Sequence, residues 1–83
     1  MSTENEEKYI NSFVEALEIE KSVVKSNLEY NSITEWDSIG HMTLIAALEE
    51  KFDISFETDD IIDFSSFKKG TEILGKYKIN FDE

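Results

Sequence analysis

The chain has 83 residues, no cysteine and a formal net charge of −11 at pH 7. This length suits one small domain over residues 1–83, and the missing cysteine excludes disulfides and thiolate metal sites. No apolar run approaches the roughly 20 residues of a membrane span, and the acidic start at Met1–Lys8 is unlike a signal peptide. We therefore expect a complete, soluble, cytoplasmic, monomeric protein that repels nucleic acid.

The first predicted element is a helix over about residues 3–17. Four apolar residues there have the i, i+3, i+4, i+7 spacing of one helix face; they are Ile10, Phe13, Val14 and Leu17. Residues 18–36 show no sustained period and are predicted to be a long loop that its own apolar side chains pack against the core. These side chains are Val23, Val24, Leu28, Ile33 and Trp36.

A second helix is predicted from Ser38 to about Lys51. Its core face is expected to consist of Met42, Ile45, Leu48 and Phe52, with Ile39 and Leu44 further round. The alternating segment Asp53–Phe56 is interpreted as a loop, and Thr58–Asp63 as a short third helix with acids in its first turn.

A fourth helix is predicted to follow a cap at Ser65 or Ser66 and to reach about Lys78. Its inward residues are expected to be Phe67, Ile73, Leu74 and Tyr77. Three longer helices, one short helix and a long first loop predict an all-α fold, a small four-helix bundle.

Ser38 stands where the polar loop becomes the second helix. The first N–H groups of a helix lack intrahelical partners, and the helix dipole makes that end positive. A phosphodiester on the Ser38 hydroxyl would therefore lie in a favourable place. Asp37 is expected either to cap the helix or to help orient the metal of a modifying enzyme. By itself an Asp-Ser pair is an ordinary helix cap.

The wider pattern resembles the acyl carrier protein family over about residues 3–79. The resemblance lies in the attachment-site segment Trp36–Met42, in Ala47–Phe52 of the second helix and in Phe67–Leu74 of the last helix. It implies that Ser38 carries 4′-phosphopantetheine, loaded from coenzyme A by a phosphopantetheinyl transferase with a divalent metal. It also implies that the chain is not an enzyme but holds a thioester for enzymes of fatty acid, polyketide or specialised acyl metabolism.

The expected partners are loading ligases or transferases and downstream synthases with basic docking surfaces, because residues 26–67 carry ten acids and one lysine. The predicted docking residues are Asp37, Ile39, Met42, Glu49, Glu50, Asp59 and Asp60. An apolar patch near the site is expected from Ile39, Met42, Leu44, Ile61 and Ile62. Fatty-acid carriers commonly have acids where this chain has Gly40, His41 and Thr43, which favours specialised partners.

Two other functions remain open from the residues alone. One is an aminoacyl or peptidyl carrier of the D-alanyl or nonribosomal type, and the other is an unmodified acidic helical interaction module. A nucleophile–base pair of Ser38 and His41 is disfavoured because no third group orients the histidine, which we expect to be exposed beside the attachment site and able to touch its phosphate. The acids of Thr58–Asp63 lack the EF-hand pattern, so no metal site is predicted.

Overall fold

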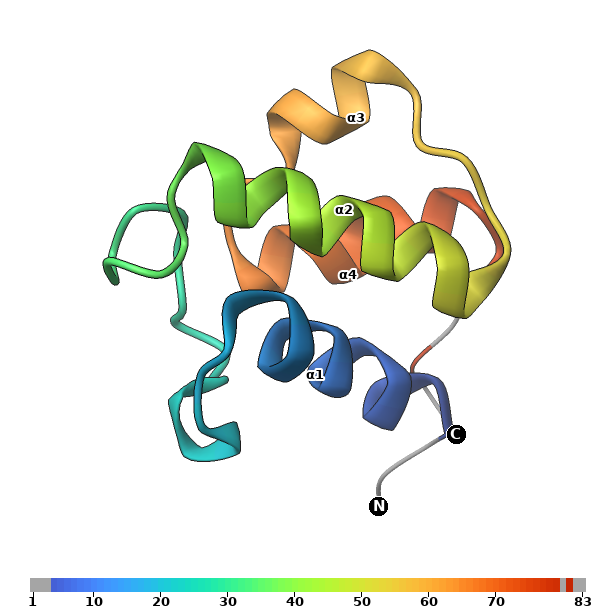
Figure 1. Ribbon diagram of the computed structural model, residues 1–83. Helices are drawn as coiled ribbons and strands as arrows, with labels where there is room; N and C mark the ends of the chain where they lie inside the picture. The colour runs from blue at the N-terminus through green and yellow to red at the C-terminus, as the bar shows by residue number, and fades with distance from the viewer. Residues whose placement is uncertain (1–3, 80, 82–83) are drawn as a thin grey trace.

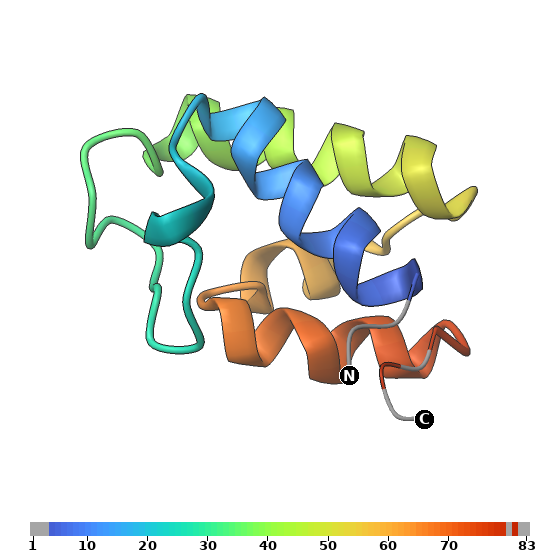
Figure 2. The ribbon, with the colours of Figure 1, turned by 90° about the horizontal axis from the view of Figure 1, so that it is seen from below.

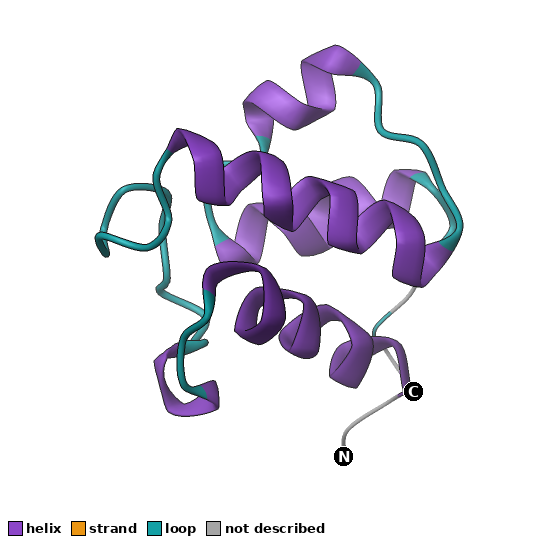
Figure 3. Cartoon of the chain, viewed as in Figure 1, coloured by secondary structure: helices purple, strands orange, loops and turns teal. Residues whose placement is uncertain are grey.

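The computed structural model describes residues 4–79 and 81, and in these residues the fold is all-α with no β-strand. Successive helices alternate in direction (Figure 1). They are α1 (Glu4–Leu17), α2 (Ser38–Phe52), α3 (Thr58–Asp63) and α4 (Phe67–Lys76), with a short 3-10 helix η1 (Lys21–Val23). Figure 3 shows the long first loop in teal between α1 and α2. The predicted bundle of three longer helices and one short helix is confirmed.

The buried face of α1 is offset by one residue from the predicted stripe. Phe13 and Leu17 are buried as expected, but Tyr9 is fully buried whereas Ile10 and Val14 are only half-buried. Tyr9 can enter the core because its hydroxyl donates a hydrogen bond of 2.5 Å to the carbonyl oxygen of Phe67, so that its polar tip is satisfied.

The predicted burial of two α2 residues, Met42 and Leu44, is the reverse of the burial observed. Leu44 is fully buried, whereas 56% of Met42 is exposed; Ile45 and Leu48 are buried as predicted, and Phe52 is half-buried. Apolar residues occur nearly all round the first turns of α2, so their spacing fits more than one inward face. The packing of α2 against α1 decides which face is buried.

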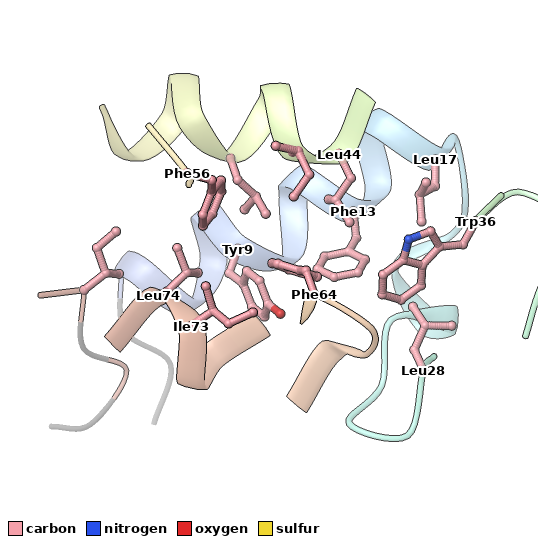
Figure 4. Packing of buried hydrophobic residues seen from close by; sticks show 13 residues of the cluster. Tyr9, Phe13, Leu17, Leu28, Trp36, Leu44, Phe56, Phe64, Ile73 and Leu74 are labelled. Atoms are coloured by element: carbon pink, nitrogen blue, oxygen red, sulfur yellow. The ribbon is translucent and has the colours of Figure 1, made fainter. Parts of the chain in front are cut away.

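The core joins residues from α1, α2 and α4, from the first loop and from the segments on either side of α3 (Figure 4), and the half-buried Ile61 of α3 packs against it. Phe13 packs its ring edge to face with Trp36 at 5.2 Å between centroids. In the first loop, Leu28 and Trp36 are buried and Val23, Val24 and Ile33 are half-buried. This confirms that the loop is packed by its own apolar side chains.

The short α3 has the predicted bounds, and α4 ends two residues earlier than expected. The Ser66 hydroxyl caps α4 by accepting a hydrogen bond of 2.9 Å from the N–H of Lys69. The chain turns after Lys76 because Lys78 adopts a left-handed conformation, with φ 68°. Asp53 closes α2 in the same conformation, and residues 54–57 form the predicted loop.

The start of α2, the end of α3 and the start of α4 lie at the same end of the bundle as the first loop, as Figures 1 and 2 both show. The start of α1 and the end of α4 lie at the opposite end. Ser38 therefore lies at the end of the bundle where several elements meet.

In the described part of the chain, no helix has the length and apolarity needed to cross a membrane.

Candidate functional site

Ser38 is the first residue of α2, and its side chain is exposed. The preceding Asp37 caps the helix, because its Oδ1 accepts a hydrogen bond of 2.8 Å from the N–H of Gly40. Of the two roles that the sequence left open for Asp37, the structure shows the helix cap. Among residues 4–79 and 81 the Ser38 hydroxyl makes no hydrogen bond, and the N–H groups of Ser38 and Ile39 donate none. The hydroxyl and two donors are therefore available together at the positive end of α2.

Gly40 lets the loop approach the first turn of α2. A Cβ atom at this position would collide with the backbone oxygen of Glu35 and would lie 3.0 Å from Cδ2 of Leu17. Every larger residue would therefore push the loop before Asp37 away from the helix. The glycine that the sequence leaves unexplained is needed to build the turn that presents Ser38.

A chain of two hydrogen bonds links Trp36, His41 and Ile61 behind this turn. The buried indole N–H of Trp36 donates to Nδ1 of His41 (3.0 Å), and Nε2 of His41 lies 2.9 Å from the carbonyl oxygen of Ile61. Because an indole nitrogen only donates, Nδ1 must accept. The neutral imidazole therefore carries its hydrogen on Nε2 and donates it to α3.

The prediction of an exposed His41 is wrong. Its ring is half-buried, stacks beside Trp36 and lies edge to face with Tyr30. The burial of Trp36 in the core draws His41 inward, and both ring nitrogens are occupied. His41 therefore offers no free nitrogen to a phosphate on Ser38, nor a base for a nucleophilic serine.

The predicted apolar patch is smaller than expected and lacks Leu44, which is buried. Three large apolar side chains of α2 and α3 are exposed to solvent, namely 77% of Ile39, 56% of Met42 and 71% of Ile62. Ile61 is half-buried. We call Ile39, Met42 and Ile62 the apolar patch. Large apolar side chains this exposed are a feature of interaction surfaces where they form one contiguous patch.

Some of the acids predicted to dock partners are hydrogen-bonded within the fold, and the others are exposed. Asp60 does not belong to the docking surface, because it is buried and accepts hydrogen bonds from Nζ of Lys76 (2.5 Å) and the hydroxyl of Tyr77 (2.6 Å). The hydrogen bond from Lys76, and then that from Tyr77, lowers the pKa of Asp60. Asp60 thus ties α3 to α4, a role that depends on residues 16 and 17 positions away.

Glu49 is also used within the fold, since its Oε2 accepts a hydrogen bond of 2.8 Å from the N–H of Phe56. Asp37, Glu50 and Asp59 are exposed, although one oxygen of Asp37 is occupied by the helix cap. In residues 4–79 and 81, no three His, Cys, Asp or Glu side chains are grouped in a way that could hold a metal ion.

A pocket of about 260 Å³ lies beside the first turn of α2, which presents Ser38. It is lined by Tyr30, His41, Ile61, Ile62, Phe64 and Ser65. The sequence did not single out Tyr30 or Ser65 as site residues. Their only sequence signals are an aromatic residue in a polar part of the loop and a second serine before α4. Their juxtaposition depends on a backbone hydrogen bond from the N–H of Tyr30 to the carbonyl oxygen of Ser65 (2.9 Å).

No protein-family model, no curated protein and no solved structure matches this chain.

Proposed function

We propose that the protein is an acyl carrier whose Ser38 holds 4′-phosphopantetheine. The observation that carries the proposal is an exposed, unbonded serine hydroxyl at the first residue of a 15-residue helix. The turn that holds it is fixed by the Asp37 cap and the close approach at Gly40. When bound, the arm would supply a terminal thiol that carries an acyl group as a thioester.

The loading step requires a phosphopantetheinyl transferase and coenzyme A. The Ser38 oxygen forms a bond to the phosphorus atom that bears pantetheine, and the bond from this phosphorus to 3′,5′-ADP breaks. The nucleotide leaves with the bonding electrons, and the serine proton passes to a base of the transferase. The unpaired N–H groups of Ser38 and Ile39 and the positive end of α2 favour the resulting phosphodiester.

The exposed surface of α2 and α3, together with the cap residue Asp37, combines apolar and acidic groups. The apolar patch provides area that a partner can bury, and the exposed acids Asp37, Glu50 and Asp59 attract a basic partner surface. We therefore propose enzymes with an apolar contact site and a basic rim as partners. Added salt should slow their association, because exposed charges are screened beyond about 8–10 Å at physiological ionic strength. A rate independent of salt would exclude steering by these acids.

Mass measurement of the intact protein tests the proposal. The protein is incubated with coenzyme A, magnesium and a promiscuous phosphopantetheinyl transferase, and one arm mass should be gained. Ser38→Ala should gain none, whereas Ser26→Ala, which alters another exposed serine, should gain the same mass as the parent. Failure of several transferases to load the parent would instead favour the unmodified interaction module.

The aminoacyl or peptidyl carrier remains the second candidate, because Gly40, His41 and Thr43 stand in place of the acids usual in fatty-acid carriers and favour specialised partners. The two kinds of carrier share the arm and differ in the thioester. Protein purified from its own host and weighed before and after hydroxylamine treatment gives the mass of the cargo. An amino acid mass would support the second candidate over the first.

A further inference from the structure

We propose that the pocket beside Ser38 binds the pantoyl segment of the arm, the branched part next to the phosphate. This inference rests on the proposed function and adds a second, noncovalent contact site for the same group. His41 lines the pocket and lies three residues after Ser38. At a rise of about 1.5 Å per residue, this separation is about 4.5 Å along the helix axis.

This short separation selects the part of the arm that the pocket receives. The pantoyl group follows directly after the phosphate, whereas the thiol and its cargo lie at the far end of a long flexible chain. A group that fills a pocket within one helical turn of the attachment point is therefore the first segment of the arm. Cargo would reach this pocket only if the arm folded back on itself.

The chemistry of the pocket walls fits the pantoyl group. Ile61, Ile62 and Phe64 form apolar walls that suit the two geminal methyl groups. Tyr30 and Ser65 also line the pocket, and their hydroxyls make no hydrogen bond within the described residues. Such hydroxyls suit the hydroxyl and amide of the pantoyl segment. Small-molecule sites commonly combine apolar walls with a few polar groups in this way.

The pocket is held open by contacts that do not involve a ligand. Both nitrogens of His41 are hydrogen-bonded, so its ring is a fixed wall. Phe64 is buried in the core, and the backbone hydrogen bond between Tyr30 and Ser65 holds the loop to the start of α4. A preformed site costs little ordering when a tethered group enters it. The arm should therefore leave Ser38 towards α3.

Isotope-filtered NMR on the full chain tests this contact directly. The protein is labelled with 13C and 15N and loaded with an unlabelled arm from coenzyme A. Cross-peaks should appear between the geminal methyl protons of the arm and the methyls of Ile61 and Ile62 or the ring of Phe64. The same methyl signals should shift when the apo protein is converted to the loaded form, and should shift no further when an acyl group is added to the thiol.

Two exposed isoleucines beside Ser38 provide a matched pair of variants. Ile62→Asn changes a pocket wall, and Ile39→Asn changes a residue outside the pocket; 71% and 77% of these side chains are exposed, so both variants should fold. Each variant is loaded to completion and its mass verified before the spectrum is recorded, because removing a residue of the apolar patch should slow the transferase. The cross-peaks to Ile61 should be lost in Ile62→Asn and retained in Ile39→Asn.

These experiments distinguish failure of the pocket site from failure of the carrier function. Full loading without these cross-peaks would overturn the pocket site and leave the carrier function intact. Shifts that appear only after acylation would also overturn it, because they would assign the pocket to the cargo. Absence of loading would remove the carrier function and this inference together.

Discussion

The indole N–H of Trp36 donates a hydrogen bond of 3.0 Å to Nδ1 of His41 at the base of the turn that presents Ser38. Since the chain contains one tryptophan and one histidine, both partners can be observed without interference from residues of the same type. We expect the neutral imidazole to be the Nε2–H tautomer, with 15N shifts typical of an unprotonated Nδ1. A protonated Nδ1 in the neutral ring would contradict the hydrogen bond.

Replacing Trp36 by phenylalanine should lower the free energy of unfolding and change the tautomer population of His41. The variant keeps an aromatic ring but leaves Nδ1 without its donor. Loss of such a hydrogen bond costs about 0.5–1.5 kcal/mol, to which the smaller ring adds a packing loss. Urea unfolding followed by circular dichroism measures the change, because the variant has no tryptophan fluorescence.

The hydrogen bonds that Lys76 and Tyr77 donate to Asp60 should make the free energy of unfolding depend on pH in the acid range. Because these partners lower the pKa of Asp60 from its ordinary value of 3.8, the folded protein favours the ionised carboxylate. The resulting stabilisation is present above pH 3.8 and is lost as the pH falls through the lower pKa of the folded state. Asp60→Asn should be less stable at neutral pH and should lose less stability on acidification.

Urea unfolding at a series of pH values from 2 to 7, in about unit steps, follows this difference. Asp59→Asn is the matched control, since it removes the neighbouring exposed carboxylate of the same helix. Equal loss of stability on acidification in Asp60→Asn and the parent protein would show that the hydrogen bonds to Asp60 do not contribute to the pH dependence of stability.

Gly40→Ala and Gly75→Ala should change stability in opposite directions. Alanine favours a helix over glycine by up to about 1 kcal/mol, but at position 40 its Cβ would collide with the Glu35 backbone. Overpacking of this kind costs about 1–3 kcal/mol. At position 75 nothing lies within 4 Å of an added Cβ, so stability should rise. Denaturant midpoints measure both effects, and a stabilising Gly40→Ala would refute the close approach.

Leu44→Ala and Met42→Ala test which face of α2 is inward. Leu44 is fully buried, and its truncation should cost about 2–5 kcal/mol. Met42 is 56% exposed, and its truncation should change stability by less than about 1 kcal/mol. Thermal and urea unfolding would show the difference, and equal losses would mean that both residues are buried.

Local signals in the sequence were sufficient to locate the helices. The caps at Asp37 and Ser66 and the bounds of α3 agree with expectation, because capping and turn formation depend on neighbouring residues. The early end of α4 was missed because Lys78 takes a left-handed conformation, which its residue type does not indicate.

Two of the side-chain roles that sequence reasoning missed, those of Tyr9 and Asp60, depend on partners far away in the sequence. Tyr9 can be buried because the carbonyl oxygen of Phe67 accepts a hydrogen bond from its hydroxyl. Asp60 can be buried because Lys76 and Tyr77 donate hydrogen bonds to its carboxylate. None of these three partners can be inferred from spacing along a helix, since 58, 16 and 17 residues separate the pairs. A period indicates which residues share a face, but it does not indicate what that face meets.

By itself, the sequence determined the all-α class, the helix order and the position of Ser38 at the start of a helix, because these follow from local hydrogen bonding and periodicity. Only the tertiary structure decided the inward face of α2, the engagement of His41 and the pocket beside Ser38. These features require segments far apart in the chain to pack together, and contact between helices selects one arrangement among several that the local pattern permits.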